Sequence, residues 1–338
     1  MVKKITQKSR TSSKIHSILI TGGSGSIGKV LLPKLIDHYK IYALGRKVKN
    51  FPKDICLNKN FHFIECDYQN VKHISIHEKI DCVIHLGGQV AGKSISFEDY
   101  KKSNLDFTKI LLEFAKLKSV KKFIFSSSVS VYGKNKKEKI TEDSKLEGIS
   151  DYAISKILAE NILLENKKVP VTIFRIGSVY GENNKSFINK LIHLMKKRII
   201  PFLNYGRNSK NFIYIGDLVE YFLLEIKKDR KSNIIFNIVN PEKVEYPNLI
   251  RLIQKNLSGS VYLKIPISKF LLQTVSNFNR IAFFFKLTKT KYVIDLSPLT
   301  GSQEISATKA IQEYRYSPKV QIEEGIDRLL NQNIKSSS

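Results

Sequence analysis

Tyr152 and Lys156 are separated by three residues in the stretch YAISK. On a helix this spacing places both side chains on the same face, where they can interact. A tyrosine beside a lysine can belong to the acid–base machinery of an enzyme, and it can equally belong to a solvated helix face. The elements around the pair must decide between these two interpretations.

The composition is that of an ordinary globular protein. The chain has 338 residues, 42% hydrophobic and 26% charged, enough for one large α/β domain or for a main domain with a smaller one. No apolar run approaches the roughly 20 residues of a membrane helix, so no integral membrane segment is expected. Three cysteines without a CxxC pair argue against a disulfide framework and predict a cytoplasmic protein. Residues 1–15 are basic and lack an apolar signal region; we expect them and residues 331–338 to be disordered tails.

The net charge of +27 results from 57 Lys and Arg against 30 Asp and Glu. Such an excess can attract nucleic acid, an anionic membrane surface or an acidic substrate. Because the cations are scattered and no recognition motif accompanies them, no nucleic-acid partner is expected. The basic, amphipathic stretch 268–289 is compatible with peripheral membrane contact, although packing within the protein is the preferred interpretation. His73 and His77 have a helical spacing, but no third ligand follows them, so no metal site is predicted.

Short, nearly continuous apolar runs alternate with helical patterns. Such runs are typical of parallel strands covered on both faces, and the alternation predicts an α/β fold with a Rossmann-type, doubly wound parallel sheet. Ligands of such folds lie at the carboxyl ends of the strands. Strands are expected at 16–21, 40–45, 61–66, 81–87, 121–127, 171–177 and 233–239. Helices are expected near 26–38, 98–118, 151–166, 184–197 and 216–228.

The pattern loosens after about residue 180. We therefore assign the dinucleotide-binding domain to residues 16–180, with the elements at 212–240 returning to it. Residues 181–211 and 241–330 carry Pro, Gly and basic loops. We expect them to form a smaller C-terminal lobe that supplies the substrate site.

The stretch ILITGGSGSIGKVLL begins with the first strand and opens a helix. Gly22, Gly25 and Gly28 are spaced as in a dinucleotide-binding loop. In such a loop the first glycine permits a tight turn, the second lets the backbone approach a pyrophosphate, and the third lets helix and strand pack closely. We expect the phosphates at the positive end of this helix, next to Ser26 and Ile27.

The second strand is followed by Arg46 and Lys47, at the point where an acidic residue would hold the ribose 2′-hydroxyl of NAD. An arginine here accommodates a 2′-phosphate, so Arg46 favours NADP, unless the two cations are simply solvated. Asp67, at the end of the third strand, is placed to meet the adenine ring. The sequence therefore predicts NAD or NADP as the cofactor.

Several motifs in one order along the chain resemble those of the extended short-chain dehydrogenase/reductases, of the NAD-dependent epimerase/dehydratase type that acts on nucleotide sugars. The resemblance runs from about Ser17 to about Leu330 and is specific for the superfamily rather than for the substrate. It rests on TGGSGSIG, HLGGQV, NLDFTKILLEFA, FIFSSSVSVYG, YAISK, FRIGSVYGEN, NFIYIGDLVEYF and SATKAIQEYRYSPKVQIEEGIDRLL.

The resemblance implies that Ser128, Tyr152 and Lys156 are catalytic. The charges of Lys156 and of a bound nicotinamide would lower the pKa of Tyr152 from about 10, so that the phenol could accept a proton from a sugar hydroxyl or return one to a ketone. Lys156 would also bind the nicotinamide ribose, and Ser128 would orient the same oxygen as Tyr152. The resemblance further implies cofactor contacts by Leu86, Gly87, Gly88 and Asn104.

The chain departs from the family's pattern on the substrate side. Dehydratases of this family carry Asp-Glu directly after the catalytic hydroxyl, whereas this chain has Val129 and Ser130, so dehydration is not expected. Ser178 and Gly216 stand where relatives often carry Asn and Asp. We expect Ser130 and Ser178 to face the substrate. Candidates for holding a diphosphate, in what is otherwise a solvated basic loop, are Arg207, Lys210 and Asn211.

The leading hypothesis is hydride transfer at a ring carbon, C4, of a nucleotide-activated sugar. It covers a 4-epimerase and a 4-keto-reductase of surface-polysaccharide synthesis. One alternative is a 3β-hydroxysteroid-dehydrogenase-like oxidoreductase acting on a lipid-like hydroxyl, which the apolar stretch IAFFFKL motivates. Another is a non-catalytic, cofactor-binding interaction protein. The resemblance also implies a homodimer built on two helices per subunit, one of which carries Tyr152.

Overall fold

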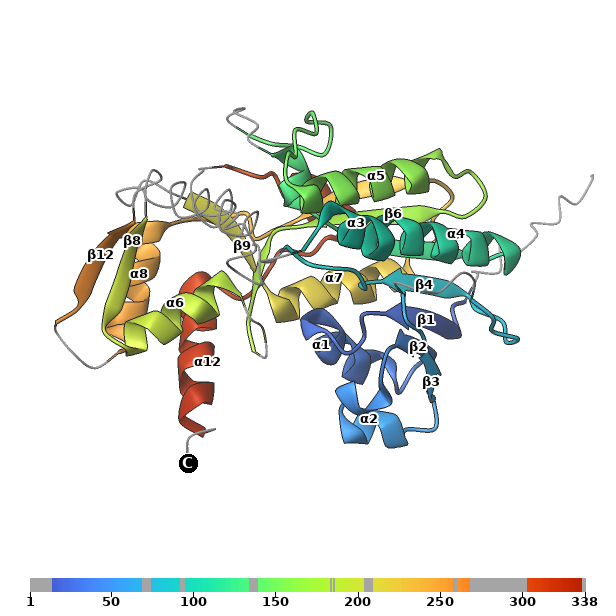
Figure 1. The fold of residues 1–338 in the computed structure, drawn as a ribbon, viewed down its shortest axis with the longest axis horizontal. Helices are drawn as coiled ribbons and strands as arrows, with labels where there is room; N and C mark the ends of the chain where they lie inside the picture. The colour runs from blue at the N-terminus through green and yellow to red at the C-terminus, as the bar shows by residue number, and fades with distance from the viewer. Residues whose placement is uncertain are drawn as a thin grey trace, which may run out of the picture.

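The computed structural model describes residues 14–68, 74–91, 95–133, 139–182, 184, 186–203, 209–257, 261–267 and 303–335. Its centre is a seven-stranded parallel sheet with the strand order β3–β2–β1–β4–β5–β6–β10 (Figure 1). The strands are β1 (Ser17–Thr21), β2 (Lys40–Gly45), β3 (Phe61–Glu65), β4 (Cys82–His85), β5 (Lys122–Ser128), β6 (Val171–Ile176) and β10 (Ile234–Ile238). The predicted fold class and all seven predicted strands are confirmed.

Apolar side chains leave the sheet on both faces and form two cores. Ile18 and Ile20 belong to the core beneath α1 (Ser26–Leu35), α7 (Ile215–Lys227) and α11 (Thr308–Tyr314). Leu19 points the opposite way, into the core beneath α4 (Phe107–Leu117) and α5 (Asp151–Glu165). Because successive side chains of a strand alternate between faces, a strand buried on both sides must be apolar throughout, which explains the continuous apolar runs.

A separate lobe lies beside the main sheet, on the left of Figure 1. It has its own apolar core, to which Leu191, Leu249 and Ile326 contribute. Its strands form a three-stranded sheet, β11–β9–β7, and a pair, β12–β8. The lobe elements are β7 (Ser178–Tyr180), α6 (Phe187–Lys196), β8 (Ile199–Leu203), β9 (Ser209–Tyr214), β11 (Lys243–Glu245), α8 (Tyr246–Lys255), β12 (Leu263–Ile267) and α12 (Ile322–Lys335).

The structure corrects two of the expected boundaries. The lobe already begins with β7, and β9 continues past residue 211 into the region assigned to the main domain. At the other end of the chain α12 runs through Lys335, so residues 331–335 are helical and not a disordered tail. Residues 1–13 of the expected basic tail and the amphipathic stretch 268–289 lie outside the described residues.

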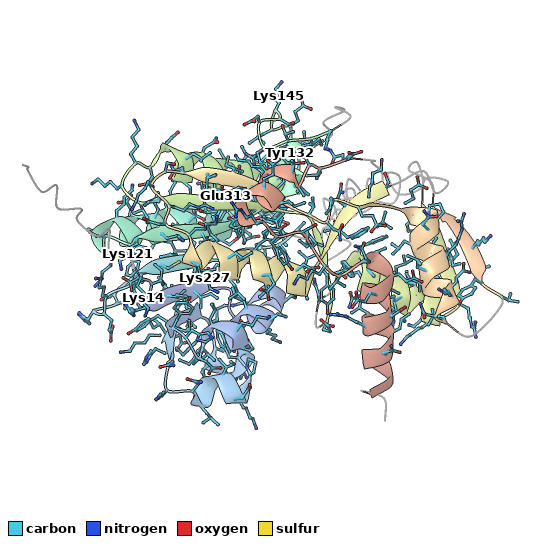
Figure 2. All side chains as sticks on the ribbon, turned by 180° about the vertical axis from the view of Figure 1, so that it is seen from behind. Lys14, Lys121, Tyr132, Lys145, Lys227 and Glu313 are labelled. Atoms are coloured by element: carbon cyan, nitrogen blue, oxygen red, sulfur yellow. The ribbon has the colours of Figure 1, made fainter. Side chains whose placement is uncertain are left out.

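The charged side chains are distributed over the molecule. Figure 2 shows side chains over the whole molecule, with Lys145 at the top of the view and Lys14, Lys121 and Lys227 at the left of the main domain. This distribution agrees with a general compositional excess of lysine better than with one basic binding face. Of the helices described, none combines the length and apolar character needed to cross a membrane.

Candidate active site

The glycine loop between β1 and α1 depends on very close backbone contacts. Gly22 has a φ of +69°, and a Cβ atom added to it would lie 2.7 Å from the backbone nitrogen of Gly87. A Cβ atom on Gly28 would lie 2.3 Å from the backbone oxygen of Gly23. Gly25 precedes α1 and provides no side-chain cap for its first turn. The N–H groups of this helix end therefore fit an anionic phosphate, as predicted.

A cavity of about 420 Å³ opens at the carboxyl ends of β1, β2 and β4. The predicted cofactor residues found in its wall are Gly22, Gly25, Ser26, Ile27, Arg46, Leu86, Gly87 and Gly88. The wall also contains Asn50, Cys66, Tyr68, Phe107 and Asn184, which were not predicted. Cys66 and Tyr68 follow β3 directly, so the rule that ligands lie beyond strand ends would have identified them.

The two residues expected to contact the adenosine half of the cofactor differ in position. The Arg46 guanidinium lies 5.6 Å from the centroid of the Tyr68 ring, and both residues line the cavity. Asp67 is exposed and is not among the lining residues. The structure therefore supports Arg46 as a candidate and does not support direct contact by Asp67.

His85 is fully buried at the end of β4 and connects the glycine loop to the helix α4. Its Nδ1 lies 2.7 Å from Thr21 Oγ1 and its Nε2 lies 3.0 Å from Thr108 Oγ1. Thr108 donates its own hydroxyl proton to the carbonyl of Asn104, so it accepts from Nε2–H. Thr21 accepts from the N–H of Gly87 and donates to Nδ1. This assigns a neutral, Nε2-protonated imidazole, consistent with the burial that holds the pKa of His85 well below its usual range.

Tyr152 lies in the first turn of α5, which Ser150 caps by accepting a hydrogen bond from the N–H of Ala153 at 3.2 Å. Ser128 ends β5, and its hydroxyl is hydrogen-bonded to the phenol. Burial raises the pKa of Tyr152 to about 12, and the bond with Ser128 partly opposes this rise. The direction is opposite to the one expected from the sequence, because burial of the phenol outweighs its polar contact in the protein alone. The lowered pKa stays a prediction for the cofactor complex.

Lys156 is buried one helical turn after Tyr152. Its Nζ donates to the carbonyl of Ser126 at 2.9 Å and lies 4.7 Å from the centroid of the Phe125 ring. Burial lowers the pKa of Lys156 to about 8, and the charge of Glu160 opposes this decrease. An ammonium group has three N–H donors; the hydrogen bonds of Lys156 to the described residues use one of them, so the others can serve a bound ligand.

Asn104 lies in a π-helical turn, Lys101–Asp106, between α3 (Phe97–Tyr100) and α4. Its Oδ1 accepts from the N–H of Gln89 at 2.7 Å, and its Nδ2 donates to Ser155 Oγ at 2.9 Å. It thus joins the turn after β4 to α5, directly beside Lys156. Asn104, like Tyr152 and Lys156, is absent from the cavity wall, so the implied cofactor contacts of these three residues stay predictions. Asn104 positions the elements that form the site, as π-turns at functional sites often do.

Ser130, one of the expected substrate residues, lies two positions after the catalytic hydroxyl of Ser128 in the chain. It lies in a 3₁₀ turn, Val129–Tyr132, and its own N–H donates to the Ser128 hydroxyl at 3.2 Å. The Ser130 Oγ is buried and has no hydrogen-bond partner among the described residues. A buried hydroxyl of this kind favours a ligand that completes its bonding.

The other expected substrate residues come from the lobe. Asn211 is buried, and its amide donates to the carbonyl of Asn240 at 3.0 Å and accepts from the N–H of Ile305 at 2.9 Å. These bonds tie β9 to the segment after β10 and to Ile305, so the amide of Asn211 is already bonded within the protein and its contact with a diphosphate stays a prediction. Lys210 and Ser178 are both partly exposed on neighbouring strands, β9 and β7. Arg207 lies outside the described residues.

A comparison with protein families decides the identity of this site. The family described as "NAD dependent epimerase/dehydratase family" matches residues 18–238, from β1 to the end of β10. The chain belongs to the NAD dependent epimerase/dehydratase family. The family membership inferred from the motifs is thereby confirmed, and with it the prediction of an NAD(P)-dependent enzyme of the nucleotide-sugar epimerase or oxidoreductase type.

Relatives in this family are named for different activities. The "uncharacterized UDP-glucose epimerase YtcB" of Bacillus subtilis is 28% identical over 72% of this chain and 82% of its own. The dTDP-D-glucose 4,6-dehydratase of Homo sapiens is 32% identical over 65% of this chain and 68% of its own. A UDP-glucuronic acid 4-epimerase from Bacillus cereus, solved in complex with NAD, has a TM-score of 0.76 at 23% identity over 95% of this chain and 100% of that one.

Proposed function

We propose that the protein is a 4-epimerase of a nucleotide-activated sugar. The observation that carries the proposal is the placement of Ser128, Tyr152 and Lys156 at the end of β5 and the start of α5, where β5 neighbours β4 in the sheet and β4 neighbours β1, the strand that leads into the family's glycine loop. NAD, when bound, supplies the acceptor and donor of hydride. The relatives named as epimerases support this proposal, as does the similar epimerase structure solved with NAD bound.

The residues of the chain have separable roles in this chemistry. Tyr152 takes the proton of the sugar hydroxyl when the ring carbon is oxidised and returns it when the carbon is reduced. Ser128, bonded to the phenol, orients the same sugar oxygen. Lys156 keeps a positive charge next to the phenol, and its spare donors bind the cofactor ribose. A lowered pKa of Tyr152 in the complex follows from that charge.

Dehydration is disfavoured despite the 32% identity to a dehydratase. Expulsion of water needs an acid and a base beside the catalytic hydroxyl. At the two positions after Ser128 the 3₁₀ turn carries Val129 and Ser130, neither of which is ionisable in the required range. The Ser130 hydroxyl in the same turn has no hydrogen-bond partner among the described residues, which supports a substrate contact at this position.

Two observations bear on the choice between epimerase and reductase, and between NAD and NADP. Arg46 in the cavity wall favours a 2′-phosphate and with it a reductase that uses NADPH. The epimerase is preferred because epimerases recur among both the relatives and the similar solved structures. Lys210, Ser178 and Arg207 remain candidates on the substrate side, and a role in surface-polysaccharide synthesis is part of this proposal.

A cytoplasmic homodimer completes the proposal. Helix α5 is apolar around much of its circumference, and Ile154 and Leu158 remain partly exposed on it. These two residues are four positions apart and therefore share one face. An apolar face on the helix that carries Tyr152 supports association of two subunits there.

The experiment combines cofactor release with product analysis. The purified protein is denatured, the released nucleotide is quantified, and the native protein is given UDP-glucose, UDP-N-acetylglucosamine or UDP-glucuronic acid without added cofactor. We expect bound NAD and formation of the 4-epimer of one sugar. Stoichiometric NADPH oxidation with a 4-keto sugar would replace the epimerase by a reductase. Oxidation of a 3β-hydroxysteroid without turnover of any nucleotide sugar would favour the lipid-like alternative.

A further inference from the structure

Three consecutive serines at the end of β5 each contact a different residue of α5. The contacts pair Ser128 with Tyr152, the carbonyl of Ser126 with Lys156, and Ser127 with Glu160. The three partners on α5 follow one another at intervals of four residues, so they share one face of the helix. The first two pairs belong to the catalytic machinery, whereas the third has no role in the proposed chemistry.

Glu160 is fully buried and paired with Arg175 of β6. The Arg175 Nη2 and Nε donate to Glu160 Oε2 at 2.8 and 3.1 Å, and the Ser127 hydroxyl donates to Oε1. Donors thus meet both oxygens of the carboxylate, and charge-assisted hydrogen bonds of this kind are stronger than neutral ones. Glu160 therefore forms a buried ion pair with Arg175, one helical turn beyond Lys156.

Arg175 extends this contact to the neighbouring elements. Its Nη1 donates to the Tyr132 hydroxyl at 2.9 Å and to the carbonyl of Glu142 at 2.8 Å. Tyr132 in turn donates to Asn237 Oδ1 on β10 at 2.6 Å. The pair thus lies within a polar network that connects β5, β6, β10 and α5 immediately behind the catalytic groups.

We propose that Glu160 is a positioning residue, whose buried carboxylate keeps the Lys156 ammonium charged and fixes the register of α5 on β5. The inference rests on the proposed function in one respect, namely that Lys156 acts as a cation beside Tyr152. Because an anion one turn away stabilises a buried cation, the carboxylate offsets part of the burial that otherwise lowers the proton affinity of Lys156.

The other groups that face Lys156 do not supply this charge. From β4, His85 is neutral, as its two threonine partners and its lowered pKa show. From β5, the neighbours are the Phe125 ring and a backbone carbonyl. From α5 itself, the Tyr152 phenol is protonated near neutral pH. Arg175 of β6, which is paired with Glu160, is itself a cation and cannot supply a negative charge.

The test measures the pKa of Lys156 directly in the protein without substrate or cofactor. ¹³C-lysine-labelled protein is titrated by NMR, with the Lys156 signal assigned by its loss in Lys156→Met. In Glu160→Gln we expect the pKa of Lys156 to fall by about 1, a tenfold loss of proton affinity. Since no sugar is needed, the result is independent of whether the proposed epimerase activity is found.

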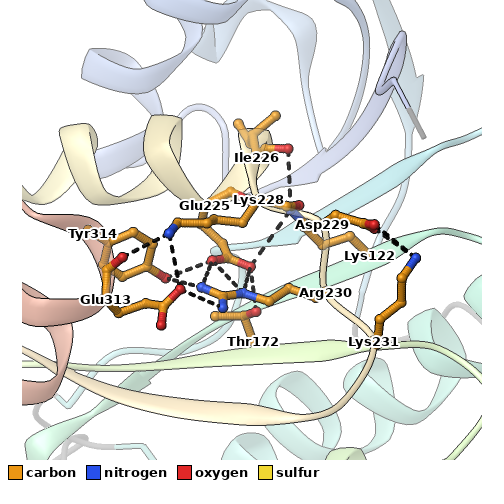
Figure 3. Close-up of polar contacts among 10 residues, drawn as sticks. All are labelled: Lys122, Thr172, Glu225, Ile226, Lys228, Asp229, Arg230, Lys231, Glu313 and Tyr314. Atoms are coloured by element: carbon orange, nitrogen blue, oxygen red, sulfur yellow. Dashed lines mark hydrogen bonds and ion pairs between the residues drawn. The ribbon is translucent and has the colours of Figure 1, made fainter. Parts of the chain in front are cut away.

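The matched control is Glu225→Gln, which removes another fully buried glutamate from the opposite end of the sheet (Figure 3). It should leave the Lys156 titration unchanged. If Glu160→Gln fails to fold, the double variant Glu160→Gln/Arg175→Gln removes both charges together and should lower the pKa of Lys156 in the same direction. An unchanged Lys156 titration in a folded Glu160 variant, or loss of folding in the double variant too, would overturn the positioning role. Where epimerisation is measurable, the alkaline limb of the kcat profile should move to lower pH in Glu160→Gln alone.

Discussion

Two buried ionic clusters lie at opposite ends of the same strands. They differ in how many N–H donors of the adjoining buried lysine are hydrogen-bonded. The site cluster, Glu160 with Arg175, lies at the carboxyl ends of β5 and β6 beside Lys156. The distal cluster, Glu225 with Arg230 and Lys122, lies at their amino ends (Figure 3). In both, a fully buried glutamate receives an arginine and a hydroxyl donor.

The two buried lysines show the difference. Lys122 donates to the carbonyls of Glu225, Ile226 and Lys228, which use all three of its N–H groups. The described contacts of Lys156 use one. Burial lowers the pKa of both side chains. A cation with all its donors satisfied holds the fold together, whereas a buried cation with spare donors is available for a ligand.

The largest effect is expected from a substitution at the catalytic site, that of Tyr152. Tyr152→Phe removes the proton-transfer group and should lower kcat by roughly 10²–10⁴-fold. The Ser128 hydroxyl, which orients the same sugar oxygen, does not replace the phenol in giving and taking the proton. The urea-unfolding midpoint of the variant should stay near that of the wild type. Retention of most of the activity would mean that the proton passes through another residue. The site cluster would then no longer differ from the distal cluster by lying next to the proton-transfer group.

The next effect concerns the distal cluster. Glu225→Gln leaves Arg230 and Lys122 without their buried anion, and removal of one partner of a buried pair typically lowers the free energy of unfolding by about 3–5 kcal/mol. Urea denaturation measures this loss. The folded variant should keep its kcat, because Glu225 lies at the opposite end of the strands from Tyr152. A reduced kcat at full folding would show that the distal cluster also supports the site.

The pH dependence of stability should separate Lys156 from the satisfied charges. Its pKa is about 8 in the folded protein and 10.5 for an ordinary lysine. Between these values the unfolded state binds more protons, so the contribution of Lys156 to stability rises with pH. The stability advantage of Lys156→Met should therefore be largest below pH 8 and shrink by up to about 3 kcal/mol toward pH 10.5. A difference that is constant across this range, measured by urea denaturation at each pH, would contradict the lowered pKa of Lys156.

The smallest effect is expected for an exposed pair that serves as a baseline. Lys34 of α1 lies 2.8 Å from Glu220 of α7, and the two side chains are 45% and 37% exposed. Lys34→Gln should change the free energy of unfolding by less than about 1 kcal/mol, because solvent screens such pairs. Thermal denaturation at low and high salt measures this change. A loss comparable to that of Glu225→Gln would mean that burial does not distinguish ionic contacts in this protein.

The sequence predicted the sheet well because its strands are buried on both faces and therefore read as apolar runs. In the lobe, β7 and β11 are only three residues long, and β8 and β12 each contain a proline, which argues against an inner strand, so none of the four was predicted individually. The glycine loop indicated the cofactor phosphate site, and YAISK indicated the catalytic residues, since both combine fixed spacing with a defined chemistry. For Asn211, the basic loop gives no indication that its amide bonds to Asn240 and Ile305, which are distant in sequence.

The buried network behind the site was missed, although the sequence contained a signal for it. Arg175 interrupts the apolar strand VTIFRIG, and a charged residue in a buried strand requires a partner. Glu160 repeats the four-residue spacing of Tyr152 and Lys156 on the same helix. What spacing cannot provide is the register of α5 on β5, which decides which serine meets which partner.

The contact between Gly22 and Gly87 limits how this enzyme can be altered by stepwise mutation. A methyl group on Gly22 would meet the backbone of Gly87, and one on Gly87 would lie 2.7 Å from Thr21 Oγ1. Replacing either residue first therefore produces a clash that the other cannot relieve, so a library of single substitutions should be depleted at both positions. Arg46, which also lines the cavity, has no such constraint and is the practical starting point for selecting a variant with changed cofactor preference.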